Sequence, residues 1–452
     1  MTSKSALMRG AAVGVLLAVG LGASAQAATV HKKAHRPTAA ESANKALMDQ
    51  VQALSTQVQA LQSRLDAQAQ AQQQTQAQVA ATQTQVADAN TKVDKVVADS
   101  DSVEQRLDDV PSTVLATLGE VPKPPKSWTD NTVVSGRMYY DLSNIEQKNN
   151  GVKVPATGTG FDIKRLYIGI DHKFNDTYSA NVTTDMQYSS AVGATELYLK
   201  KAYLQAKYSD ALIVQLGAND LPWVPFVEDI YGYRYLENTL TEHAKMATSS
   251  DWGLHVLGKL GPYISYNGAI IDGAGYKAPV RSKTMDVEGR INATYNGFTV
   301  AVGGYSGKLG KDTVGVAVYH TASRFDALAA YVQGPIRVGL EYYTANDWNN
   351  VTTVAQDKTE GYSVFGSYAI TPVVSVFGRY DWVKPRKTTT PTVTEDYFNF
   401  GLQYEPVKII DLSLAYKREK ADNGAVVTSN GTIGGSISGT YDEVGLFGQV
   451  RY

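Results

Sequence analysis

From residue 132 to the end of the chain, hydrophobic and polar side chains alternate with a period of two. The segment TVVSGRMYYDL, for example, places Val134 and Met138 on one face and Arg137 and Asp141 on the other. A period of two is typical of β-strands whose two faces meet different surroundings. Because a dry protein core does not accommodate so many charges, the pattern predicts strands with lipid on one face and water on the other.

The connections between these segments alternate between short and long. Short periplasmic turns, long external loops and an even number of strands are typical of outer-membrane barrels. The sequence therefore predicts an all-β transmembrane barrel of about sixteen antiparallel strands. The segment TVGVAVYHTA fits either a strand or a loop, so the count is least secure across 308–325. The expected strands are 132–142, 161–174, 177–188, 196–208, 211–218, 251–260, 263–272, 283–296, 298–307, 320–332, 335–346, 358–370, 372–383, 393–405, 407–418 and 441–451.

The longest irregular stretch of this region is residues 219–250, which are rich in aromatic side chains. Loops of this length are usually functional or disordered, and the aromatic content argues against disorder. We expect the loop to fold inward and narrow a channel; the alternative is a loop packed over the barrel mouth without a role in selection. The expected constriction residues are Trp223, Glu228, Asp229, Tyr231, Tyr233, Arg234, Tyr235 and Glu237. The expected basic residues of the channel wall are Arg137, Arg165, Lys201, Arg290, Arg337 and Arg379.

The N-terminus has the pattern of a secretory signal peptide. Lys4 and Arg9 precede an apolar run, and the small residues Ala25 and Ala27 offer a cleavage site. This pattern predicts a signal peptide over 1–27 and a bacterial envelope protein, with an uncleaved anchor as the alternative. No later stretch is apolar for long enough to form a transmembrane helix.

A heptad repeat lies between the signal peptide and the strands. Residues 28–40 form a basic tail, and apolar residues then recur at steps of four and three, which predicts a coiled coil over 41–110. A disordered spacer rich in Gln and Ala is the alternative. Residues 111–130 contain several prolines and form the expected linker to the barrel domain, 131–452. The repeat begins with Leu47, Val51, Leu54, Val58, Leu61 and Leu65.

Composition excludes several classes of function. The net charge of −2 gives no basic footprint for nucleic acid, and the absence of Cys excludes thiolate catalysis and Cys-based metal sites. No two histidines share metal-ligand spacing within one predicted element, and no catalytic or nucleotide-binding motif is present. A barrel hydrolase built around His255 is the remaining enzymatic alternative. We therefore predict no enzymatic activity, no cofactor and no metal.

The segments FDIKRLYIGIDHKFNDTYSANVTTD, ELYLKKAYLQAKYSDALIVQLGANDLPW and SSDWGLHVLGKL resemble the phosphate-selective porin O and P family of trimeric outer-membrane porins. The resemblance covers roughly 130–452 and implies sixteen strands, a homotrimer and a third loop folded into the pore. It also implies a ladder of basic residues that selects anions. Here the charges of the loop and wall are mixed.

We therefore expect a passive channel for small hydrophilic solutes or ions, with weak cation preference or none. Phosphate or other anion selectivity is the first alternative, and a sugar channel, with loop aromatics as stacking surfaces, is the second. A structural tether from the outer membrane to peptidoglycan, reached by the coiled coil in the periplasm, is the third.

The last segment, YDEVGLFGQVRY, has the features of a barrel-assembly signal. Leu446, Val450 and the terminal Tyr452 share the face expected to point outward. The expected partners are outer-membrane lipid and lipopolysaccharide of a Gram-negative bacterium, the barrel assembly machinery, and two further copies of the chain.

Overall fold

The computed structural model describes residues 127–189 and 194–452, together with scattered positions between 48 and 92. Internal contacts divide the chain into two units, Met1–Pro122 and Lys123–Tyr452. The described positions of the first unit are helical, and heptad residues such as Val51 and Leu54 are exposed. The signal peptide, the basic tail and most of the coiled coil and linker lie outside the described residues, so they stay predictions.

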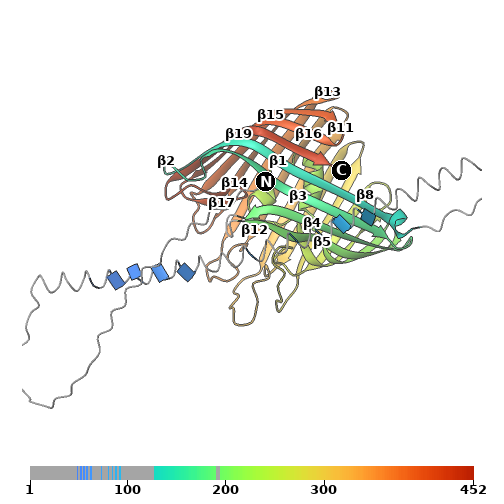
Figure 1. Ribbon diagram of the computed structural model, residues 1–452, viewed down its shortest axis with the longest axis horizontal. Coiled ribbons are helices and arrows are strands. Elements are labelled where there is room, and N and C mark those ends of the chain that lie inside the picture. The colour runs from blue at the N-terminus through green and yellow to red at the C-terminus, as the bar shows by residue number, and fades with distance from the viewer. Residues whose placement is uncertain are drawn as a thin grey trace, which may run out of the picture. The chain divides into compact units, whose positions relative to one another are not determined.

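The second unit is a closed antiparallel β-barrel (Figure 1). Its main sheet has 17 strands, of which β2 (Val152–Lys153) has two residues, so sixteen strands form the wall. The predicted fold class and strand number of this domain are therefore confirmed. The wall strands are β1 (Thr132–Asn149), β3 (Gly158–Lys173), β4 (Tyr178–Ser189), β5 (Ala194–Ser209), β6 (Leu212–Asp220), β7 (Ser250–Leu260), β8 (Ile264–Ile271), β9 (Asp286–Tyr295), β10 (Phe298–Gly307), β11 (Ala322–Gln333), β12 (Ile336–Asn346), β13 (Lys358–Thr371), β14 (Val374–Lys384), β15 (Thr394–Val407), β16 (Ile410–Asp422) and β19 (Ser438–Arg451).

The first and last wall strands close the barrel. β1 and β19 pair from Arg137 opposite Arg451 to Asn149 opposite Gly439. The terminal Tyr452 extends the pairing: its backbone N–H donates to the carbonyl of Gly136 at 3.1 Å and its carbonyl accepts from the same residue at 2.8 Å. A closed sheet has no free edge, so every strand of the wall has two hydrogen-bonded neighbours.

The remaining described elements lie outside the wall sheet. The short helix η1 (Trp128–Asn131) precedes β1, and the helices α3 (Val224–Tyr231) and α4 (Leu240–His243) lie between β6 and β7. A small hairpin forms from β17 (Val426–Thr428) and β18 (Gly431–Ile433). The ambiguous segment TVGVAVYHTA is irregular up to its last residue, Ala322, where β11 begins.

The two faces of the wall differ as the alternation predicts. Leu142, Val302 and Leu402 are exposed on the outer face, whereas Asp185 and Lys417 are buried on the inner face. Among the residues that the structure describes, no helix is long and apolar enough to cross a membrane.

Candidate functional site

The loop between β6 and β7 starts and ends at neighbouring positions of the wall. Asp220 and Ser250 are register partners, and the N–H of Leu221 donates to the carbonyl of Ser249 at 2.9 Å. The residues between them, 221–249, therefore form a loop that leaves and rejoins the sheet at one site. Most of its side chains are buried, which places this inward-folded loop against the inner surface of the barrel.

The first part of this loop is helical because its sequence favours both ends of a short helix. Proline occupies the first turn of α3, where its missing N–H is not needed. The helix ends at Gly232, whose φ of 81° lies in the left-handed region that glycine adopts readily. Between these ends, Val224, Val227 and Tyr231 form the buried face.

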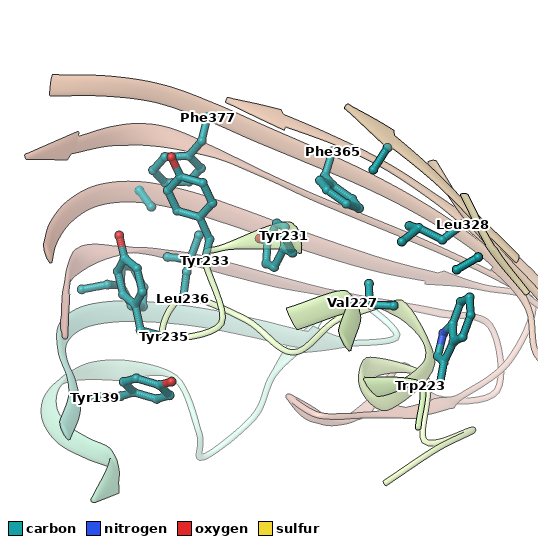
Figure 2. Close-up of a cluster of buried hydrophobic side chains, with 14 residues drawn as sticks. Tyr139, Trp223, Val227, Tyr231, Tyr233, Tyr235, Leu236, Leu328, Phe365 and Phe377 are labelled. Atoms are coloured by element: carbon teal, nitrogen blue, oxygen red, sulfur yellow. The ribbon is translucent and has the colours of Figure 1, made fainter. Parts of the chain in front are cut away.

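Aromatic side chains of the loop pack against aromatic side chains of the wall (Figure 2). The ring centroids of Tyr231 and Phe365 are 5.3 Å apart in an edge-to-face arrangement, and those of Tyr233 and Phe377 are 4.4 Å apart. Burial of these rings is the main apolar contribution to holding the loop inside the barrel. Trp223, Tyr231, Tyr233 and Tyr235 are all at most 4% exposed, so the alternative in which these rings offer stacking surfaces to sugars finds no support.

The polar atoms of the same rings bond to the wall. The indole Nε1–H of Trp223 donates to Glu341 at 2.9 Å, and the hydroxyl of Tyr233 donates to Gln403 at 2.8 Å. The hydroxyl of Tyr235 lies 2.6 Å from Oγ of Ser413. The aromatic side chains therefore make both apolar contacts and hydrogen bonds with the wall, and these contacts together hold the loop in one position.

Comparison with solved structures identifies the architecture. The anion-selective porin from Comamonas acidovorans aligns with a TM-score of 0.55 at 11% identity, over 71% of this chain and 99% of that chain. The trimer form of OmpT, an outer-membrane protein of Vibrio cholerae, aligns with a TM-score of 0.50 at 12% identity, over 71% and 99%. The fold is that of the outer-membrane porins. OmpF of Salmonella typhi, in complex with daunomycin, also aligns with a TM-score of 0.50 at 12% identity, over 73% and 100%. No protein-family model and no curated protein matches the sequence.

In porin folds of this kind, the charges that face the lumen decide which ions the channel favours. Among the predicted constriction residues, Glu228 forms an ion pair with Arg234. Arg234 also lies 3.4 Å from Glu242, so one guanidinium is shared between two carboxylates. These three side chains have little exposure, and Arg234 compensates one of the two negative charges, so their formal charges sum to −1.

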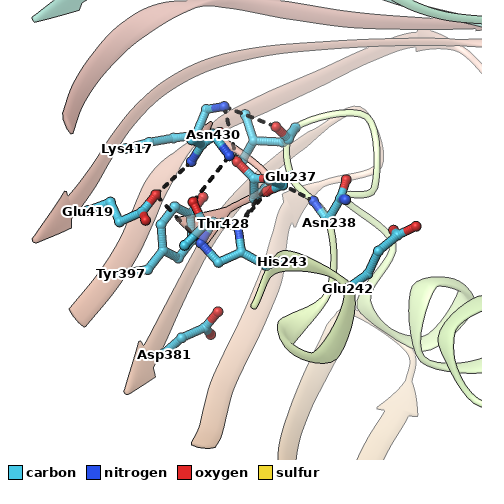
Figure 3. Close-up of polar contacts among 12 residues, drawn as sticks. Glu237, Asn238, Glu242, His243, Asp381, Tyr397, Lys417, Glu419, Thr428 and Asn430 are labelled. Carbon is cyan, nitrogen blue, oxygen red and sulfur yellow. Dashed lines mark hydrogen bonds and ion pairs between the residues drawn. The ribbon is translucent and has the colours of Figure 1, made fainter. Parts of the chain in front are cut away.

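Glu237 does not project into the lumen; it is buried at the far end of the loop (Figure 3). Its carboxylate accepts a hydrogen bond of 2.8 Å from Ser429 and lies 3.5 Å from Nζ of Lys417. Burial alone raises the pKa of this carboxyl, but Lys417 and His243 outweigh that effect and hold the pKa well below its usual value. Glu237 is thus an ionised anchor of the loop.

Three of the predicted basic wall residues are neutralised by carboxylates. Nη1 of Arg165 lies 2.9 Å from Asp185. Nζ of Lys201 lies 3.0 Å from Asp220. Arg379, which is buried, pairs with Asp381 on the same strand, two residues away. The partner of each of these basic side chains compensates its charge, so their contribution to the potential of the lumen is small.

The other three basic wall residues have no carboxylate within 4 Å among the described residues. Arg137 is exposed, Nε of Arg290 donates to the carbonyl of Pro222 at 2.7 Å, and Nη1 of Arg337 donates to the carbonyl of Ile230 at 2.7 Å. A neutral carbonyl satisfies a guanidinium hydrogen bond but leaves its charge uncompensated. These residues therefore add net positive potential to the lumen.

One predicted acidic residue of the loop remains exposed to the lumen. Asp229 lines a cavity of about 510 Å³ together with Arg137, Glu228 and Asp220. Partial burial raises the pKa of Asp229, while the charge of nearby Arg137 opposes that shift. Within the predicted set, three uncompensated arginines thus oppose one uncompensated carboxylate.

Two lysines on the inner side were not in the predicted set. Lys164 donates to the carbonyl of Leu236 at 3.0 Å, and the buried Lys200 donates to Ser249 at 3.3 Å. Strict alternation would point each of them outward, because Arg165 and Lys201 face inward. Each lies at a β-bulge, where the register of its strand shifts by one residue. A bulge redirects a side chain, and alternation alone gives no sign of it.

Proposed function

We propose that this chain is a passive outer-membrane channel for small hydrophilic solutes, narrowed by residues 221–249, and that it favours anions. The observation that carries the proposal is the pairing of the charges on the inward-folded loop. Glu228 and Glu237 are held by basic partners, while Arg137, Arg290 and Arg337 have no carboxylate at ion-pair distance among the described residues. The structurally similar anion-selective porin from Comamonas acidovorans supports the same preference for anions.

This proposal reverses the preference inferred from the charge count alone. A count weighs every carboxylate equally, whereas the field in a narrow channel depends on charges that are close to the lumen and uncompensated. A permeating anion passing Arg137 would meet a favourable potential that low-dielectric walls focus. The carboxylate of Asp229 and the second carboxylate that shares Arg234 reduce this potential but do not cancel three arginines.

The reversal potential of purified channels in a planar bilayer with a salt gradient tests this proposal. The unchanged channel should have an anion-selective reversal potential. The variant Arg137→Gln should lower the ratio of anion to cation permeability about two- to five-fold, because a charge about 4 Å away in water is worth about 1 kcal/mol. The double variant Arg165→Gln/Asp185→Asn is the matched control, because it removes an ion pair and leaves the net charge unchanged. A cation-selective unchanged channel would contradict the proposed sign.

We infer that the working assembly is a homotrimer in the outer membrane of a Gram-negative bacterium, inserted among lipid and lipopolysaccharide by the barrel assembly machinery. The trimer form of OmpT supports the oligomeric state. The apolar outer wall and the predicted signal peptide support the location. A tether to peptidoglycan through the helical segment is compatible with channel activity, and the two roles can coexist in one chain.

A further inference from the structure

A buried cluster of one histidine and two carboxylates links the inward-folded loop to the wall. His243 ends α4, Glu395 lies on β15 and Glu419 lies on β16. Nε2 of His243 is 3.3 Å from Oε1 of Glu395 and 3.6 Å from Oε2 of Glu419. All three side chains are at most 1% exposed. Figure 3 shows His243 directed toward Glu419, across the space between loop and wall.

Several buried polar atoms of this cluster have no hydrogen-bond partner among the described residues. They are Nε2 of His243, both carboxylate oxygens of Glu395 and Oε1 of Glu419, whereas Oε2 of Glu419 accepts from Asn430 at 3.0 Å. A buried polar atom without a partner destabilises the fold, and more so when it is charged, so four of them in one cluster call for an explanation. All of these atoms belong to His or Glu, which are residue types that commonly coordinate metal ions in proteins.

The other nitrogen of the imidazole is oriented by a hydrogen-bond chain. Oγ of Ser429 donates to Glu237 at 2.8 Å, so it accepts from Nδ1–H of His243, which lies 2.7 Å away. This chain places a proton on Nδ1, so Nε2 is the ring nitrogen that faces the two carboxylates and can offer a lone pair to a metal ion. A histidine that binds a metal through one ring nitrogen usually donates a hydrogen bond from the other, which fixes the orientation of the ring.

The spacing of the three groups suits a small divalent cation. Bonds of about 2.1 Å in tetrahedral geometry separate neighbouring ligand atoms by about 3.4 Å. Both distances from Nε2 are close to this value, and the donor atoms of the trio all lie within 4.8 Å of one another. Without a metal, the only described basic group at ion-pair distance from Glu395 and Glu419 is His243. A proton on its imidazole balances one of two buried negative charges, whereas a divalent cation balances both.

We propose that His243, Glu395 and Glu419 bind a divalent first-row transition metal that fastens the inward-folded loop to the barrel wall. The mixed nitrogen and oxygen donors favour Zn²⁺ over Mg²⁺ and Ca²⁺, which prefer oxygen ligands alone. The metal is structural, since the cluster is buried and all three ligands come from elements that it would join.

Zn²⁺ uptake by the untagged, folded protein tests the proposal. After treatment with a chelator, the full chain in detergent is equilibrated with Zn²⁺ and its metal content is measured. One tightly held Zn²⁺ per chain is expected, with Mg²⁺ and Ca²⁺ unable to displace it. His243→Gln and Glu419→Gln should each lower the affinity at least about 100-fold, and Ser429→Ala, which removes the orienting hydroxyl, about 10-fold.

Two controls separate this site from adventitious binding. The double variant His31→Gln/His35→Gln removes the two histidines of the N-terminal tail and should leave uptake unchanged. X-ray absorption of the unchanged protein should show one imidazole among otherwise oxygen ligands, and this measurement holds even if a ligand variant fails to fold. Absence of stoichiometric Zn²⁺ uptake, uptake insensitive to His243→Gln, or a site with two or more imidazoles would overturn the proposal in favour of a protonated His243.

Discussion

At the scale of single residues, Gly232 determines how the inward-folded loop meets the wall. It ends α3 with a φ of 81°, and a Cβ built on it would lie 2.1 Å from Nη1 of Arg337. That same guanidinium nitrogen donates to the carbonyls of Asp229 and Ile230. The absent side chain thus lets an arginine of the wall reach the C-terminal end of the helix, where cations interact favourably with the helix dipole.

We predict that Gly232→Ala displaces Arg337 from the end of α3 and alters channel conductance while the barrel still forms. The left-handed backbone and the clash should together cost about 1–3 kcal/mol. Gly151→Ala is a matched control, because Gly151 also has a φ of 81° but no atom lies within 4 Å of its would-be Cβ. Single-channel recordings of both variants measure the difference; equal conductance changes in the two would show that backbone strain alone is responsible.

At the scale of elements, residues 221–249 act as one rigid insert. Trp223 fastens the start of the insert, since its indole bonds to Glu341 and its ring lies against Gly303. His243 and Glu237 fasten its far end through Ser429, which follows β17. An insert held at both ends and packed along its length keeps a constant channel width, which a mobile loop would not.

We predict that Trp223→Ala loosens the insert without unfolding the barrel. Loss of a fully buried indole should cost about 3–5 kcal/mol of packing, and the cost falls on the insert because the wall strands satisfy their own backbone hydrogen bonds. The expected readouts are larger, noisier single-channel currents with nearly unchanged heat stability of the barrel. Trp128→Ala is the control, because that tryptophan is 70% exposed. Unchanged currents in Trp223→Ala would mean that the insert does not limit conduction.

In the same insert, some features could be predicted from the sequence and others could not. Alternation predicts the wall strands because the side-chain period is local, and length with aromatic content singles out the loop. Neither predicts pairing between side chains: Trp223 meets Glu341, and Glu237 meets Lys417, across more than a hundred residues of chain. The expected projection of Glu237 into the lumen was therefore wrong, since only the closed barrel brings it beside the buried Lys417, which it shares with Glu443.

At the scale of the whole molecule, the barrel wall and the predicted coiled coil of residues 41–110 have separate sources of stability. The barrel closes through β1 and β19 and needs no partner for its backbone hydrogen bonds. The predicted coiled coil of 41–110, in contrast, buries its apolar seam only by association with other copies. In the single chain, the described seam residues Val51, Leu54 and Val58 are all more than half exposed.

We therefore predict that deleting 41–110 leaves a conducting barrel but weakens the trimer. The unchanged protein should migrate as a heat-modifiable trimer, and the deletion should dissociate at a lower temperature or detergent concentration. A matched variant that changes Leu47, Val51, Leu54, Val58, Leu61 and Leu65 to Ser keeps the length of the segment and removes the apolar part of the seam with which the repeat begins. This variant should dissociate like the deletion if the seam drives association. Trimers of undiminished heat stability in both variants would place the association in the barrel wall, and loss of membrane insertion would contradict the independence of the barrel.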